Sequence, residues 1–124
     1  MTRTPRARAR NLALGLTALI ALAIGVLSLI PLPQGPDLPG TDKTHHLIAY
    51  GALVLPLATL APRSLLWLVP LALAYGGAIE LIQPLTGRFG EWLDLAANGT
   101  GLLLGAGLGL ILNRVLALGR HLTG

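Results

Sequence analysis

Side chains that could bind a ligand or carry protons gather in three short segments of an otherwise apolar sequence. They are Asp42, Lys43, His46 and Tyr50, then Glu80, Gln83 and Arg88, and finally Asp94 and Asn98. An imidazole such as that of His46 can transfer protons when carboxylates flank it, and the planar guanidinium of Arg88 can hold an anion. The residue types therefore indicate a polar binding site.

Helical spacing would place the members of each segment on one side of a helix. At about 100° per residue, Asp42, His46 and Tyr50 lie within roughly 80° of arc. Lys43 falls just beyond this arc, whereas His45 points elsewhere. Glu80 and Gln83 are three apart and Asp94 and Asn98 are four apart, so each pair also shares a face. Arg88 is expected in the loop after the third segment, from which its guanidinium can reach back to Glu80 or Asp94. Each segment thus predicts one polar helix face.

The composition indicates the class of protein to which these helix faces belong. Of the 124 residues, 53% are hydrophobic and only 11% are charged. Such values are typical of membrane proteins. The sequence pI of about 10.8 reflects basic residues beside apolar segments, as membrane orientation requires, so no nucleic-acid partner is expected. The sequence has no cysteine, which excludes disulfides and thiolate metal sites.

Four apolar segments are long enough, or nearly so, for the roughly 20 helical residues that a bilayer core needs. They cover residues 11–30, 42–60, 64–84 and 92–113. A basic tail, residues 1–10, precedes them. A cleaved signal peptide is the alternative for the first segment, but its apolar run is longer than signal peptides usually have. The sequence predicts an all-α membrane protein, a four-transmembrane-helix bundle forming one domain over residues 1–124.

The basic residues beside these segments predict the orientation. Seven of the nine lie near the N-terminus, in the turn at Arg63 and near the C-terminus. Lys43 and Arg88 lie on the other side, together with all five acidic residues. Because an excess of Lys and Arg marks the cytoplasmic side, both termini should be cytoplasmic and the polar site should face the exterior.

Glycines continue the polar face of the last segment. Gly101, Gly105 and Gly109 follow Asp94 and Asn98 at intervals of three or four residues, so all five share one stripe. Small residues at this spacing let two membrane helices approach closely. We expect the stripe to pack against the second or third segment and to hold the polar groups of all three at one depth.

Convergence of these groups leaves more than one chemistry open. His46, Glu80 and Asp94 are the candidates for general acid and base catalysis, although no recognisable nucleophile accompanies them. Imidazole with Asp42, Glu80 and Asp94 would suit zinc or manganese. No His-x-x-x-His or Glu-x-x-His pair occurs on one segment, so neither a metal nor any other cofactor is predicted. A structural network that locks the helices in register is the alternative to a ligand site.

Taken together, the spaced residues resemble the VanZ-like family of small membrane proteins. The shared pattern is Asp42, Lys43, His46, Ala49 and Tyr50, then Glu80 and Gln83, then Arg88, then Asp94, Asn98 and Gly101. The stretch FGEWL departs from it, because relatives commonly have a small hydroxyl residue there. The resemblance implies a multi-pass protein of a bacterial plasma or inner membrane. The founding member is linked to teicoplanin resistance, and the resemblance supplies no reaction.

Three functions follow as hypotheses. The first is interaction with cell-envelope material at the outer face, a lipid-linked or peptidoglycan-related group, with membrane lipids as the surrounding partners. The second is a membrane-embedded hydrolase or transferase that uses His46 and the carboxylates. The third is a protein that binds another membrane protein through the face lined by Gly101 and Gly105.

Overall fold

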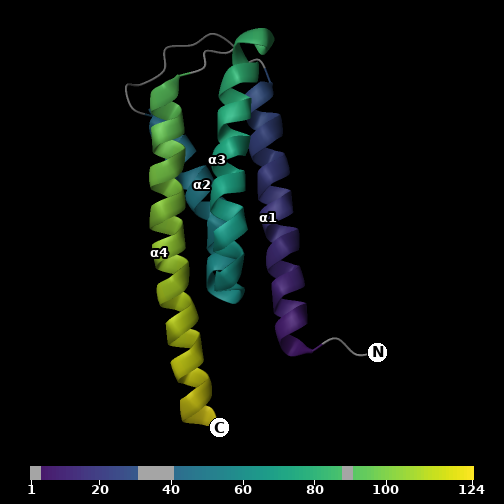
Figure 1. Cartoon of the computed structure of the whole chain (residues 1–124), viewed down its shortest axis with the longest axis vertical. Coiled ribbons are helices and arrows are strands. Elements are labelled where there is room, and N and C mark those ends of the chain that lie inside the picture. The colour runs from purple at the N-terminus through teal and green to yellow at the C-terminus, as the bar shows by residue number, and fades with distance from the viewer. Residues whose placement is uncertain (1–3, 31–40, 88–90) are drawn as a thin grey trace.

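The computed structural model describes residues 4–30, 41–87 and 91–124, and every regular element in these ranges is a helix (Figure 1). The elements are α1 (Pro5–Leu29), α2 (Thr41–Leu60), the 3-10 turn η1 (Pro62–Ser64), α3 (Leu65–Ile82), the 3-10 turn η2 (Gln83–Thr86) and α4 (Trp92–Thr123). The prediction of an all-α chain with four helices is confirmed.

The four helices run alternately up and down the bundle, so that α1 lies parallel to α3 and α2 parallel to α4 (Figure 1). The Tyr75 hydroxyl of α3 donates to the Ala21 carbonyl of α1, and Asn113 of α4 donates to the Thr59 carbonyl of α2 over 2.7 Å. The start of α1 and the end of α4 lie at the same end of the molecule.

Two helices are longer than the sequence patterns predict. Helix α1 starts at Pro5 instead of residue 11, because the Thr4 side chain accepts a hydrogen bond from the Ala7 amide and proline suits the first helical turn. Helix α4 continues to Thr123 instead of ending near 113. Because α1 starts at Pro5, most of the expected basic tail, residues 1–10, is helical. Arginine is a good helix former, so its presence there does not prevent the helix.

Three of the helical segments are long and apolar enough to cross a membrane: Pro5–Leu29, Pro62–Thr86 and Trp92–Thr123. These helices indicate a multi-pass membrane protein. Helix α2 is not among them, because its first residues, TDKTHH, are polar or charged and lower its hydropathy. Of the four segments expected to be long and apolar enough, or nearly so, three meet this standard.

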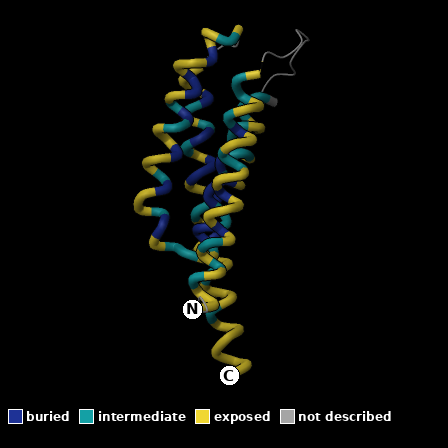
Figure 2. The backbone as a smooth tube through the Cα atoms, turned by 90° about the vertical axis from the view of Figure 1, so that its right-hand side faces the viewer, coloured by how far each residue is buried: buried dark blue, intermediate teal, exposed yellow. Residues whose placement is uncertain are grey.

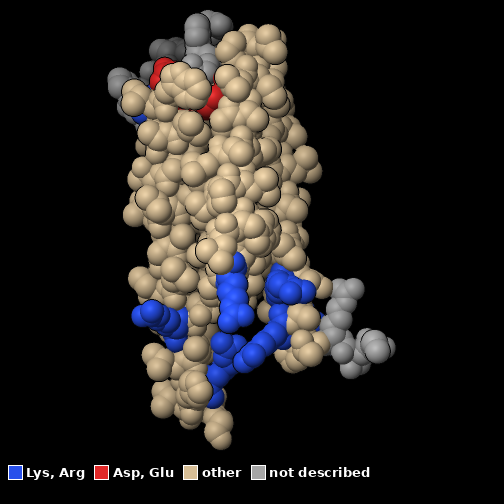
Figure 3. Space-filling view, viewed as in Figure 1, with Lys and Arg blue, Asp and Glu red and all other residues tan. Residues whose placement is uncertain are grey.

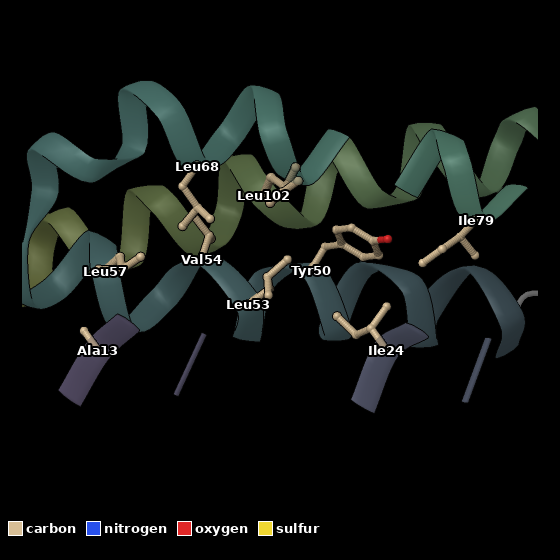
Figure 4. Close-up of a cluster of buried hydrophobic side chains, with 10 residues drawn as sticks. Ala13, Ile24, Tyr50, Leu53, Val54, Leu57, Leu68, Ile79 and Leu102 are labelled. Atoms are coloured by element: carbon tan, nitrogen blue, oxygen red, sulfur yellow. The ribbon is translucent and has the colours of Figure 1, made fainter. Parts of the chain in front are cut away.

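Helix α2 supplies more of the core than any other helix, although it is the least apolar of the expected spans. Its residues Tyr50, Leu53, Val54 and Leu57 are at most 2% exposed. Around them lie buried side chains of the other three helices, Ala13 and Ile24 of α1, Leu68 and Ile79 of α3, and Leu102 of α4 (Figure 4). Large apolar residues on the outer faces of α1, α3 and α4 are exposed (Figure 2). This distribution suits a bundle surrounded by lipid.

The glycine stripe of α4 packs against α2, as predicted. A Cβ atom added to Gly101 would overlap the Leu47 carbonyl, and one added to Gly109 would overlap Ala58. At Gly105 it would lie 2.5 Å from the Gly51 carbonyl oxygen. The two backbones touch here, and only glycine permits this approach.

The charged residues of the bundle separate to its two ends (Figure 3). At the basic end are Arg6, Arg8 and Arg10 of α1, Arg63 of η1, and Arg114 and Arg120 of α4. At the acidic end, the start of α2, the end of α3 and the start of α4 bring together Asp42, Glu80, Glu91 and Asp94. The predicted polar residues lie at the acidic end.

Candidate functional site

The polar faces of α2 and α4 meet at the acidic end through His46 and Asn98. His46 Nδ1 lies 2.8 Å from Asn98 Oδ1. Since an amide oxygen can only accept, His46 Nδ1 carries the proton and donates it. In the neutral ring, the other nitrogen, Nε2, presents its lone pair on the opposite side. Asn98 therefore sets both the tautomer and the orientation of the imidazole.

Two carboxylates face this second nitrogen. His46 Nε2 lies 3.5 Å from Asp94 Oδ2 of α4 and 3.7 Å from Asp42 Oδ1, one turn earlier on α2. The Asp94 side chain is 2% exposed and that of Asp42 is 48% exposed. The three residues form a triangle that is buried on one side and open to the end of the bundle on the other.

Lys43 lies beside this triangle. Its ammonium group donates to Glu91 Oε2 over 2.9 Å and lies 3.7 Å from Asp94 Oδ1, too far for a good hydrogen bond. Both partners of the Lys43–Glu91 pair are about half exposed, so the pair contributes little stability. It ties the first turn of α2 to the residue that precedes α4.

Glu80 brings α3 into the same site through the backbone of Glu91. Glu80 Oε2 accepts a hydrogen bond from the Glu91 amide over 2.8 Å, while the Glu91 carbonyl accepts from the Asp94 amide over 3.0 Å. Glu91 thus links Lys43, Glu80 and Asp94. Sequence reasoning missed it, although its place just before α4 was a signal, because the first amides of a helix need partners.

Gln83 and Tyr50 lie at the edges of the site and are both 2% exposed. Gln83 Nε2 donates to the Ser28 carbonyl of α1 over 3.1 Å, so it ties α1 to η2 rather than reaching the imidazole. The Tyr50 hydroxyl lies beside Gly76 and Asn98, because a Cβ atom added to Gly76 would lie 3.0 Å from that hydroxyl and 2.7 Å from Asn98 Nδ2. Glycine at position 76 makes room for both.

Four buried side-chain atoms around this site have no hydrogen-bond partner among the described residues. They are Glu80 Oε1, Gln83 Oε1, Asp94 Oδ1 and Asn98 Nδ2. Native proteins leave few such atoms, because each costs about 1–3 kcal/mol. Three of the four are acceptors, so the site lacks donors.

The predicted convergence is observed for most of the candidate residues. Hydrogen bonds, ion pairs or the shared Glu91 backbone connect six of them: Asp42, Lys43, His46, Glu80, Asp94 and Asn98. His45 is exposed and lies apart, as predicted. Arg88 lies outside the described residues, so its expected reach to Glu80 or Asp94 stays a prediction.

The glycine stripe is unavailable to a second protein. Gly101, Gly105 and Gly109 are buried, and atoms of α2 occupy the position that a Cβ atom at each glycine would take. The hypothesis of a partner docking on Gly101 and Gly105 was wrong, because a helix of the same chain occupies that face.

Comparisons with known proteins give no relative. No protein-family model matches the chain, and neither a curated protein nor a solved structure is similar to it. The similarity to the VanZ-like family therefore depends on the spaced residues alone, and the function has to be argued from the site.

Proposed function

We propose that the chain is a four-span membrane protein with its acidic end at the outer boundary. Helix α2 joins the end of α1 to the start of α3, so it has to cover the same distance as they do. Its polar first turns would lie at the boundary and its apolar remainder, residues 47–60, inside the bilayer. The six described arginines at the basic end favour a cytoplasmic location for this end and for both termini.

Reporter fusions test this orientation. Alkaline phosphatase fused after Gly124 should be inactive, while an insertion between residues 34 and 40 should be active, because this enzyme folds only outside the cytoplasm. The opposite pattern would place the polar site inside the cell and remove the basis for an envelope ligand.

At this boundary we propose that the site binds a polar group rich in hydrogen-bond donors. The unpartnered acceptors Glu80 Oε1, Gln83 Oε1 and Asp94 Oδ1 carry this proposal, since they need N–H or O–H groups that the described residues do not supply. Sugar hydroxyls, peptide amides and ammonium groups are the donors that an outer membrane boundary offers. The resemblance to the VanZ-like family favours the headgroup of a lipid-linked envelope precursor.

The charge of the site favours the same class of ligand. Four carboxylates and one ammonium group lie at the acidic end among the described residues, so with a neutral His46 the formal charge is negative. A phosphate group alone would be repelled. The sugar and peptide part of a precursor, rather than its phosphate, is therefore the part that we place near Asp94 and Glu80.

Binding to protein in lipid nanodiscs tests this function, with a chelator present throughout. The two probes are a lipid-linked sugar–peptide precursor and the same lipid phosphate without the sugar–peptide. The precursor should bind and the bare lipid phosphate should bind at least tenfold more weakly. Glu80→Gln and Asp94→Asn should abolish the difference, because each replaces an acceptor by a group that can also donate.

The matched control is Asn113→Ala on the same helix at the basic end, where the side chain donates to the Thr59 carbonyl. It should leave the preference for the precursor unchanged. Equal binding of the two lipids to the wild-type protein would refute a ligand of this class.

A further inference from the structure

We infer that Asp42, His46 and Asp94 bind one first-row divalent metal ion, of the zinc or manganese kind, at the acidic end of the bundle. One ligand atom from each residue lies within 4.8 Å of the other two. The inference goes beyond the proposed function, which needs donors for other atoms and no metal.

The spacing of the ligand atoms fits a small metal ion. A tetrahedral ion with bonds of about 2.0–2.2 Å separates its ligand atoms by roughly 3.3–3.6 Å. His46 Nε2 lies 3.5 Å from Asp94 Oδ2 and 3.7 Å from Asp42 Oδ1. The third distance joins the carboxylate oxygens of Asp42 and Asp94. Only the Asp42 side chain would have to move to shorten it, and because this side chain is half exposed the movement costs little free energy.

The surroundings of His46 match those of a metal-bound histidine. Such a residue usually donates its other ring N–H to an oxygen that fixes the tautomer, as Nδ1 does to Asn98 Oδ1 over 2.8 Å. In the neutral ring, Nε2 points a lone pair at two carboxylates. The repulsion between these acceptors is removed either by a proton on Nε2 or by a metal ion bound between them.

Burial of Asp94 supplies a second observation. Asp94 is 1% exposed and its Oδ1 has no hydrogen-bond partner among the described residues. The Lys43 ammonium, 3.7 Å from this oxygen, is too far for a good hydrogen bond, and a buried carboxylate with so little compensation is disfavoured. A divalent ion would neutralise Asp94 and Asp42 together, while Lys43 stays on Glu91, its nearer partner at 2.9 Å.

This inference revises the expectation that no metal is bound. That expectation relied on the lack of a His-x-x-x-His or Glu-x-x-His pair. The spacing of Asp42 and His46 offers an equivalent pair, because residues four apart lie on one helix face. With three protein ligands, a fourth position would remain for water or for a group of the bound ligand.

Metal titration of the purified, chelator-stripped protein tests the site. Zn²⁺ binding is measured by native mass spectrometry and Co²⁺ binding by its visible absorption, which reports a tetrahedral site with a nitrogen ligand. One ion per chain should bind. His46→Gln and Asp42→Asn should each weaken binding at least tenfold, and Asp42→Asn changes only a half-exposed side chain.

The matched control is His45→Gln, which removes the exposed neighbouring imidazole and should bind as the wild type does. Failure of the wild-type protein to bind one ion would overturn the metal site, as would equal losses in His45→Gln and His46→Gln. The donor-rich ligand is tested in chelator, so loss of the metal site alone leaves that function standing.

Discussion

The interface between α2 and α4 has two parts that are built in opposite ways. From Gly101 to Gly109 the glycines lie directly against α2, against the backbone of Leu47 and Gly51 and the side chains of Val54 and Ala58. One to two turns earlier, Asp94 and Asn98 face His46 with buried polar atoms that have no partner among the described residues. The glycine part stabilises the helix pair, and the polar part costs free energy that the glycine part offsets. Such an arrangement is expected where a site is kept for a ligand.

The largest effect should come from filling the glycine part. Gly105→Leu must separate two backbones, since even a Cβ atom would lie 2.5 Å from the Gly51 carbonyl oxygen. We expect the free energy of unfolding in detergent to fall by about 3 kcal/mol.

Gly107→Leu is the control on the same helix, because nothing lies within 4 Å of a Cβ atom added there. It should change the free energy of unfolding by less than about 0.5 kcal/mol. Equal losses in the two variants would mean that leucine disturbs α4 itself and not its contact with α2.

An intermediate effect should follow from removing a polar atom that does have a partner. Asn98→Ala leaves the Nδ1–H group of His46 without its acceptor, and an unsatisfied buried donor costs about 1–3 kcal/mol. Thr100→Ala removes an exposed hydroxyl that bonds to its own helix and should cost less than about 0.5 kcal/mol. Chemical denaturation of both variants would show whether the difference exists.

The sequence allowed most of this interface to be predicted, because both of its parts depend on helix periodicity. The spacing of Asp94, Asn98, Gly101 and Gly105 predicted one stripe, and the spacing of Asp42 and His46 predicted the face that meets it. The role of Glu91 was not predictable in the same way. Its side chain and backbone act through contacts with Lys43 and Glu80, more than ten residues away on other helices.

The ends of the helices were also predicted less well than their existence. Hydropathy located the apolar parts of α1 and α4, but arginines near the ends carry no apolar signal although they continue a helix readily. In helix α2, by contrast, the hydropathy signal is weak although the helix lies at the centre of the bundle. Its polar first turns weaken its hydropathy, although burial of Tyr50 and Val54 makes it the centre of the bundle.

The smallest stabilising effect should lie at the contact of α1 with α2. Thr17 of α1 donates to the Leu53 carbonyl over 3.0 Å, and such bonds between membrane helices contribute about 0.6 kcal/mol on average. Thr17→Val should cost about that amount without altering ligand or metal binding. A loss as large as that of Gly105→Leu would move the centre of stability from the glycine part to α1.

The central claim is that Asp94 serves a ligand and not the fold, and the unfolding of Asp94→Asn at pH 8 with chelator present tests it most directly. An amide at position 94 can donate to His46 Nε2, which the carboxylate cannot, so the apo variant should be more stable than the wild type by about 1 kcal/mol. The same variant should lose both precursor and metal binding. A fall in the free energy of unfolding by 1 kcal/mol or more, on the order of a lost buried ion pair, would show that the carboxylate stabilises the fold and would contradict the claim.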